Sequence, residues 1–270
     1  MKIGKATVPR TAICTSDAHT IVVRGRDLSK DLIGKVSFVE HFFLLLVGRM
    51  PSEGEMRVLN ATLVAIAEHG LVPSVQAARM TFAAAPDAMQ GAVAAGILGC
   101  GSVVLGSSET AGRMYSEIAA AVEGGRSLEQ AALDVPNAWR AAGKSVPGYG
   151  HPLHKERDER VNALFTVARE AGTDLAFVRI AEAVEARMPE ILGKPLKLNV
   201  SGAIPAVLLG AGFPVVALKG VPILARTAGL IAHLVEEIEK PSGFALSYQA
   251  TREVRYEGDV PDGFQVPSPA

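Results

Sequence analysis

Residues 145–164 read "SVPGYGHPLHKERDERVNAL", and they concentrate polar chemistry in a chain that is otherwise rich in apolar side chains. His151 follows directly behind a Pro-Gly-Tyr-Gly turn, and charged residues fill positions 155–160. A turn of this kind leaves backbone N–H groups exposed just before a helix, an arrangement that suits an anion or an adenine ring. The segment therefore predicts a ligand-binding loop.

Basic residues downstream of this turn support the same interpretation. Lys155, Arg157 and Arg160 follow at helical spacing, so at least two of them can lie on the face that carries His151. Arginine binds carboxylates and phosphates through two parallel hydrogen bonds. The alternative is a solvated charged helix face without a ligand, and the local pattern leaves both open.

The overall charge argues against a polyanionic partner. Lys and Arg total 27 against 28 for Asp and Glu, which gives a net charge of −1. No basic patch of the nucleic-acid-binding type stands out, so we expect no nucleic-acid partner. An anionic ligand would then be held by a few specific arginine and lysine side chains in a pocket.

Cysteine usage and apolar runs indicate a reducing compartment and no membrane span. Cys14 and Cys100 are the two cysteines, too few for a disulfide framework, and the N-terminus lacks the pattern of a secretory signal. The longest apolar runs fall short of the ~20 residues of a spanning helix. We expect a cytoplasmic protein. We also expect no metal site, because His151 and His154 have no third ligand fixed by a motif.

Helical periodicity dominates, and strand-like alternation is confined to "HTIVVRGRD" near the start, so we expect a mainly α fold. Ser37 and Glu40 form a capping-box pattern that opens a helix closed by Gly48. Other helices are expected at 53–68, 75–85, 107–122, 127–142, 156–170, 174–188, 203–209 and 221–238, with a small-residue helix in 85–102. Residues 189–202 and 239–270 are expected to be irregular. His41 and His233, inside apolar helices, are expected to be hydrogen-bonded structural histidines.

Several separated segments together resemble the citrate synthase superfamily, and especially its short members, the citryl-CoA lyases. The "SVPGYGHPLHKERDER" segment is similar to the family's G-[FY]-G-H turn with an arginine nine residues after the histidine. The "HTIVVRGRDLSKDLIGKVSFVEHFFLLLVGRMPSEGE" segment resembles its N-terminal region, "KLNVSG" resembles "NVDG", and "ARTAGLIAHLVEE" resembles "AR-[ST]-x-G-x-x-A-H". Their order and spacing make the resemblance chain-wide.

This resemblance implies roles for residues in these motifs. His151 would face the oxaloacetate part of the substrate, Arg160 and Arg226 would each bind a carboxylate, and His69 of "EHGL" would be a further substrate-binding histidine. The implied CoA-binding residues are Pro147, Gly148, Tyr149 and Gly150 in the turn, with Lys155 and Arg157 near the CoA phosphates.

Two positions depart from the family pattern. Leu105 stands where citrate synthases have the histidine that stabilises the enol of acetyl-CoA, and leucine cannot donate that hydrogen bond. Ser201 stands where they have the aspartate that removes the methyl proton, and a serine hydroxyl is not a base near neutral pH. Glu109 is a candidate replacement base. Alternatively the reaction differs, or the chain binds acyl-CoA without turnover.

The resemblance thus implies an enzyme that cleaves or forms a C–C bond between an acyl-CoA and a 2-keto acid such as oxaloacetate, with the lyase direction favoured. The alternative is a catalytically altered CoA-thioester-binding or regulatory homologue. A CoA thioester would be the substrate, without a tightly bound cofactor. A large helical domain of residues 1–106 and 213–270, a small mobile domain of residues 107–212, and a homodimer are also implied.

Overall fold

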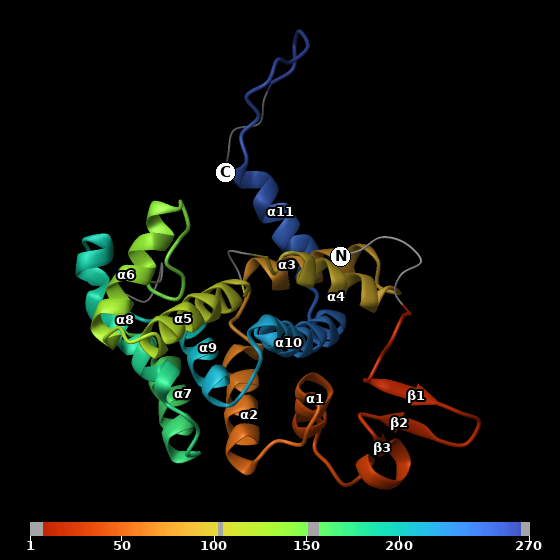
Figure 1. The fold of residues 1–270 in the computed structure, drawn as a ribbon. Helices are drawn as coiled ribbons and strands as arrows, with labels where there is room; N and C mark the ends of the chain where they lie inside the picture. Colours follow the sequence, from red (N-terminus) through yellow and green to blue (C-terminus); the bar gives the residue numbers. More distant parts are fainter. Residues whose placement is uncertain (1–7, 102–104, 151–156, 266–270) are drawn as a thin grey trace. The chain divides into compact units, whose positions relative to one another are not determined.

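The computed structural model describes residues 8–101, 105–150 and 157–265, and it is mainly helical, as expected. Three short strands precede the helices in Figure 1: β1 (Cys14–Ser16), β2 (Ile21–Val23) and β3 (Arg26–Asp27). The helices are α1 (Phe38–Val47), α2 (Glu53–Ala67), α3 (Pro73–Ala84), α4 (Met89–Leu98), α5 (Ser107–Glu123), α6 (Leu128–Ala141), α7 (Glu159–Glu170), α8 (Ala176–Leu192), α9 (Val200–Gly210), α10 (Gly220–Glu239) and α11 (Gly243–Glu253).

Contacts divide the described chain into two compact units. The first consists of residues within 1–62 and 107–218, and the second of residues within 63–106 and 219–270. The boundary at 106/107 coincides with the expected one, whereas residues 8–62 group with the segment expected to form the small domain. Compact units are not necessarily the bodies that move, so the domain assignment stays a prediction.

The first unit begins with an antiparallel sheet of order β1-β2-β3. Val23, Leu32 and Leu44 form a small apolar cluster beneath it. The capping box at the start of α1 is present, because Ser37 Oγ accepts from the Glu40 N–H and the Glu40 carboxylate accepts from the Ser37 N–H. Gly48 ends the helix in the left-handed conformation with φ of 86°.

Helices α5 to α9 complete the first unit. Helix α5 packs against α6, α8 and α9, α6 packs against α8, and α9 also packs against α7 and α8. Tyr115, Phe165, Met188 and Ile204 are among its fully buried side chains. This packing fixes the N-terminal end of α9, where Ser201 lies.

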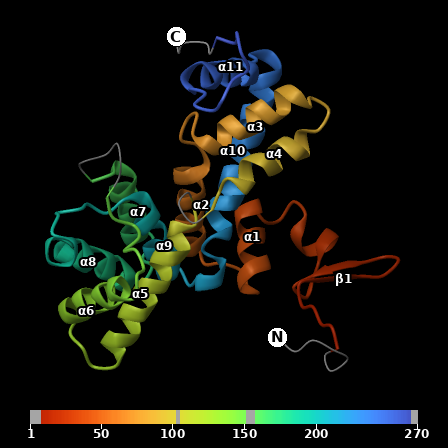
Figure 2. The same ribbon diagram turned by 90° about the horizontal axis from the view of Figure 1, so that it is seen from above.

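The second unit is formed by α3, α4, α10 and α11. Helices α3 and α4 lie side by side in both views, and α3 also contacts α10 and α11 (Figures 1 and 2). Helix α4 approaches its neighbours closely, because a Cβ atom at Gly96 would lie 2.8 Å from Ser74 O and from Leu230 Cδ1. A core cluster of Val75, Ala78, Phe82, Ala92, Leu230 and Leu234 lies between these helices.

Two expected irregular regions are wrong in part. Helix α8 continues past Pro189 to Leu192. The proline removes one N–H donor, and the helix ends only where Gly193 adopts the left-handed conformation. Helix α11 falls inside the expected C-terminal arm. Its start is stabilised by tertiary contacts, because the Glu237 carboxylate accepts hydrogen bonds from the N–H groups of Ser242 and Gly243. No local pattern signals that cap.

By length and composition alone, the stretch Val215–Glu239 could cross a membrane, and 44% of its most apolar window is buried in the protein. Core helices of non-membrane proteins meet the same criterion. Arg226 and Glu237 are also buried in this stretch. The expectation of no membrane span stays a prediction.

Candidate functional site

The structure brings the Pro-Gly-Tyr-Gly turn and the "KLNVSG" segment together in the first unit. The Gly150 N–H donates to Lys197 O over 2.7 Å, and the Asn199 N–H donates to Gly148 O over 2.9 Å. Tyr149 and Leu198 form an antiparallel β-bridge between these bonds. The two segments that resemble family motifs are therefore joined by backbone hydrogen bonds.

Asn199 locks the turn to the start of α9. Its side-chain oxygen caps the helix by accepting from the Ser201 N–H over 2.9 Å, and its amide nitrogen donates to Gly150 O over 2.6 Å. Gly150 directly precedes His151, so Asn199 fixes the backbone from which that histidine emerges. Sequence reasoning missed this residue, although an asparagine directly before a helix is a signal for an N-cap.

Two glycines allow this close approach. Gly148 has a φ of +91°, and a Cβ atom there would lie 2.7 Å from Gly202 Cα. A Cβ atom at Gly202 would lie 2.8 Å from Gly148 O and 3.0 Å from the Tyr115 hydroxyl. Side chains at either position would separate the turn from α9.

The side chain of Tyr149 points into the unit rather than toward a ligand. Its hydroxyl lies 3.0 Å from the Tyr115 hydroxyl and donates to Ala181 O over 3.0 Å. Burial raises the pKa of both tyrosines well above the ordinary value, so both are neutral hydrogen-bonding groups. The ring of Tyr149 is therefore part of the buried interior of this unit.

The two predicted arginines in the described part of the basic segment form ion pairs. Arg157 Nη2 lies 2.7 Å from Glu185 Oε2, and Glu185 Oε1 accepts from the Leu198 N–H over 3.0 Å. Arg160 forms a two-pronged pair with the buried Asp158 carboxylate, with Nη2 at 2.7 Å and Nε at 3.0 Å. Arg157 thus supports the "KLNVSG" segment, and the guanidinium of Arg160 is oriented by its neighbour.

Of the other predicted residues of the first unit, Glu109 lies far from Ser201, and two lie outside the described residues. Tyr115 lies beside Gly202 and Gly112 beside Pro205, so α5 and α9 run in opposite directions where they touch. Glu109 is six residues before Tyr115, about 9 Å along α5, and its carboxylate pairs with Arg113. This spacing weighs against direct substitution for a base at Ser201. His151 and Lys155 lie outside the described residues, and Pro147 is half-buried in the turn.

Arg226 provides the clearest anion-binding geometry in the second unit. Its side chain lies in α10 and is buried, with the residue 3% exposed. Nη2 donates to Ile66 O over 3.3 Å, whereas Nε and Nη1 have no hydrogen-bond partner among the residues that the structure describes. A buried guanidinium is costly unless an anion or acceptor compensates it. Arg226 thus has two buried donor groups without an acceptor among the described residues.

His69 follows three residues after Ile66, whose carbonyl accepts a hydrogen bond from Arg226. Gly229, one turn after Arg226, permits α10 to approach the end of α2, because a Cβ atom there would lie 2.3 Å from Ala67 O. The His69 backbone N–H donates to the Glu68 carboxylate over 2.8 Å. The two substrate-binding residues expected in this unit are thus on neighbouring elements.

Leu105 is buried in an unusual backbone conformation. It is 7% exposed and has a φ of +65°, which is rare for a residue other than glycine. The following Gly106 N–H donates to Gly101 O over 3.0 Å. The leucine side chain offers no proton or hydrogen bond where the resemblance places the enol-stabilising histidine.

A metal centre has no basis in the residues described. Within 8–101, 105–150 and 157–265, no group of three or more His, Cys, Asp and Glu side chains could hold an ion. His151 and His154 lie outside these ranges, so the expected absence of a metal stays a prediction.

Comparison with known proteins gives concordant results. Residues 9–243 match the family model for the C-terminal domain of citrate synthase. Citrate synthase of Heyndrickxia coagulans is 26% identical over 229 residues, covering 82% of this chain and 58% of that protein. Citrate synthase of Saccharolobus solfataricus is 23% identical over 209 residues, covering 76% and 54%. The chain thus spans between half and two thirds of these relatives' length.

Solved structures extend the similarity along the chain. Citryl-CoA lyase from Hydrogenobacter thermophilus is 34% identical with a TM-score of 0.82, and the alignment covers 96% of this chain and 98% of that one. ATP citrate lyase from Methanosaeta concilii, in complex with (3S)-citryl-CoA, has a TM-score of 0.77 at 23% identity and covers 96% of this chain and 43% of that one. The latter likeness shows a shared fold.

Proposed function

The chain belongs to the citrate synthase family, and on this premise we propose that it is a carbon–carbon lyase acting on citryl-CoA or a closely similar thioester. Its products would be acetyl-CoA and oxaloacetate, and the reverse reaction would be an acyl transfer of the citrate synthase type. The observation that carries the proposal is Arg226, a buried guanidinium with two donors that have no partner among the described residues. A substrate carboxylate would supply the missing acceptor.

In the proposed cleavage, His151 accepts the proton of the tertiary hydroxyl of citryl-CoA. The bond between the hydroxyl-bearing carbon and the methylene carbon next to the thioester then breaks. Its electron pair passes to the thioester as an enolate, while the carbinol carbon becomes the keto group of oxaloacetate. A proton from solvent then adds to the enolate carbon to give acetyl-CoA, and His151 releases the proton it took up, so the step balances. Arg160, Arg226 and His69 would hold the carboxylates during this step.

The start of α9 would contribute to enolate stabilisation. Ser201 lies in its first turn, where N–H groups and the helix dipole favour negative charge. Its hydroxyl can donate a hydrogen bond to an enolate, but it cannot serve as the base that the family aspartate provides. In cleavage the enolate is formed by bond breakage and protonated afterwards, whereas synthesis begins with removal of a methyl proton, so both directions need a proton-transfer group other than Ser201.

The alternative is a CoA-thioester-binding homologue without turnover. Ser201 and Leu105 favour it, because both side chains lack the acid–base groups of citrate synthases. The arginines and the turn would then bind a thioester for regulation. Both proposals include a homodimer in the cytoplasm, a CoA thioester as the ligand, and no nucleic acid, membrane, metal or tightly bound cofactor.

The test is to incubate the purified protein with citryl-CoA and, separately, with acetyl-CoA plus oxaloacetate, and to follow free CoA, acetyl-CoA and oxaloacetate. We expect turnover that His151→Ala abolishes. Saturable binding of citryl-CoA without turnover in the wild type would favour the binding homologue instead.

A further inference from the structure

The loop that carries His69 is held by the carboxylate of the residue before it. Glu68 Oε1 accepts from the His69 N–H over 2.8 Å and from the Gly70 N–H over 2.6 Å. Gly70 has a φ of +77°, so the backbone turns sharply at this point. The direction in which His69 leaves the backbone thus depends on where the Glu68 carboxylate is fixed.

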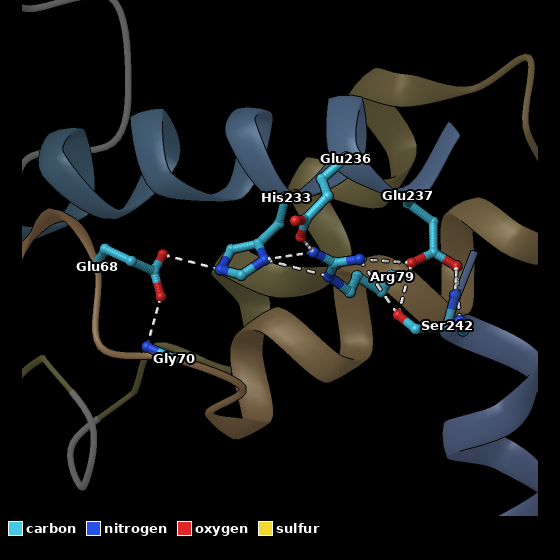
Figure 3. A network of polar contacts seen from close by, with 8 residues as sticks. Glu68, Gly70, Arg79, His233, Glu236, Glu237 and Ser242 are labelled. Atoms are coloured by element: carbon cyan, nitrogen blue, oxygen red, sulfur yellow. Dashed lines mark hydrogen bonds and ion pairs between the residues drawn. The ribbon is translucent and has the colours of Figure 1, made fainter. Parts of the chain in front are cut away.

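His233 fixes the other oxygen of this carboxylate. Figure 3 shows the imidazole between Glu68 and Arg79, with His233 Nε2 3.0 Å from Glu68 Oε2. This contact is short without being a hydrogen bond of regular geometry. Gly229 leaves room for it, because a Cβ atom there would lie 3.0 Å from the same oxygen.

Arg79 determines which ring nitrogen of His233 carries the proton. Nε of Arg79 donates to His233 Nδ1 over 3.1 Å, and Nη2 lies 2.8 Å from the same atom. A guanidinium has donors only, so Nδ1 must be the unprotonated acceptor. The ring proton then resides on Nε2, the nitrogen that lies 3.0 Å from Glu68 Oε2.

Arg79 itself is held firmly. Its side chain is 4% exposed, and Nη1 pairs with Glu237 Oε2 over 2.8 Å, a carboxylate that is 2% exposed. The same nitrogen donates to Ser242 Oγ over 3.2 Å, and Nη2 pairs with Glu236. The rigid end of the network therefore lies at Arg79 and Glu237, and its outer end lies at the His69 loop.

We propose that His233 and Glu68 are positioning residues that orient His69 toward the keto-acid part of the substrate. The inference rests on the proposed function, which makes His69 a substrate-binding residue. The contacts run from Arg79 through the His233 ring to Glu68, and from Glu68 to the Gly70 N–H (Figure 3). Glu68 also accepts from the His69 N–H. Among Arg79, His233, Glu68 and His69, only His69 needs to touch the substrate.

The state of Glu68 agrees with this arrangement. Burial alone would raise the pKa of the carboxyl, but the contact with His233 and the two backbone donors outweigh burial, and the pKa is lowered. The side chain is nevertheless 45% exposed. A half-exposed pair contributes little to global stability, so its loss should loosen the loop more than it destabilises the fold.

The test compares His233→Phe, which keeps a ring but removes both nitrogens, with His233→Gln, whose amide can accept from Arg79 and donate to Glu68. His41→Phe in α1 is the matched control for ring replacement. Backbone hydrogen exchange of a peptide spanning residues 66–72, the dissociation constant for oxaloacetate and the thermal midpoint are measured for each. A ¹⁵N spectrum of histidine-labelled protein reports the tautomer of His233 through the signal that His233→Gln removes.

We expect His233→Phe to exchange the amides of His69 and Gly70 faster and to weaken oxaloacetate binding on the order of 10- to 100-fold. His233→Gln should keep slow amide exchange and most of the oxaloacetate affinity. His41→Phe should leave the exchange rate and the affinity unchanged. Unchanged exchange at residues 69 and 70 in folded His233→Phe, or a proton on Nδ1, would overturn the inference.

Two further outcomes separate this inference from the proposed function. If wild-type protein fails to bind oxaloacetate but His233→Phe still loosens residues 69 and 70, the proposed function is wrong and the control of the loop by His233 stands. If His233→Phe does not fold, Glu68→Gln replaces it as the test variant. Its control is Glu239→Gln, because Glu239 is an exposed carboxylate in α10. The same exchange and binding criteria then apply.

Discussion

Gly148 lies directly against Gly202, so that a methyl group on Gly148 would stand 2.7 Å from Gly202 Cα. Gly148→Ala should therefore be strongly destabilising, because it adds a collision of about 1–3 kcal/mol to the left-handed backbone penalty of about 1–2 kcal/mol. Gly172→Ala is the control, since its φ is +67° and no atom lies within 4 Å of a new Cβ. Urea unfolding that gives equal losses for both variants would contradict the close contact.

The buried cation of Arg226 should lower the free energy of unfolding of the ligand-free protein and raise it when substrate is bound. Arg226→Met removes a buried cation that lacks full compensation, so the free energy of unfolding without ligand should stay equal or rise by about 1–4 kcal/mol. Oxaloacetate should raise the thermal midpoint of the wild type but not of the variant. Arg79→Met is the matched control, because that buried guanidinium is paired and its loss should cost about 3–5 kcal/mol. A destabilised Arg226→Met would show that Arg226 is structural.

Ser201 should limit proton removal from acetyl-CoA if the proposed function is correct. Ser201→Asp should accelerate deuterium exchange into the acetyl-CoA methyl group, measured by mass spectrometry in D₂O with malate as an unreactive analogue of oxaloacetate. A positioned general base contributes about 100-fold or more. Ser201→Asn is similar in size to the aspartate variant but supplies no base. Equal exchange by the two variants would mean that the proton is removed from another position.

The Glu55 carboxyl makes part of the free energy of unfolding depend on pH. Hydrogen bonds from Arg49, at 2.6 and 2.8 Å, lower the pKa of Glu55 to about 2 from its ordinary value of 4.5. This contribution is complete above about pH 4.5 and is lost as the pH falls toward 2. Glu55→Gln should be less stable at pH 7 by about 1–2 kcal/mol, a range reduced because Arg49 is half-exposed, and the difference should vanish near pH 2.

Unfolding of Glu55→Gln and wild type across this pH range checks the prediction. Glu53→Gln, an exposed carboxylate in the same first helical turn, is the control. A constant difference between Glu55→Gln and wild type from pH 7 to pH 2 would contradict the ion pair as its source.

The helices could be predicted largely from local signals. The box at Ser37 and the glycine at Gly48 bound α1 as expected, because caps depend on a few neighbouring residues. Helix α11 could not be predicted in this way, since its first N–H groups are capped by Glu237, which precedes the break between α10 and α11 and is held by Arg79. Caps supplied from other elements leave no periodic pattern.

The site could be predicted only as a set of motifs. The resemblance identified the turn before His151 and the segment around Ser201 without showing that Asn199 joins them. The role of Tyr149 in CoA binding stays a prediction, and its inward-facing ring, paired with Tyr115, could not be foreseen from the motif. His233 was expected to be a hydrogen-bonded structural histidine, and its contacts with Arg79 confirm this. The contact of His233 with Glu68, which holds the His69 loop, joins segments far apart in the sequence and could not be predicted from it.

The most direct test of the proposed function is the stoichiometry of carbon–carbon cleavage, measured as oxaloacetate and acetyl-CoA formed per citryl-CoA consumed. We predict a ratio of one to one to one for the wild type and a rate about 100-fold lower for Arg226→Gln, since loss of a buried charge partner typically costs several kcal/mol. Formation of citrate and free CoA instead, which is thioester hydrolysis, or an unchanged rate in Arg226→Gln, would contradict the account.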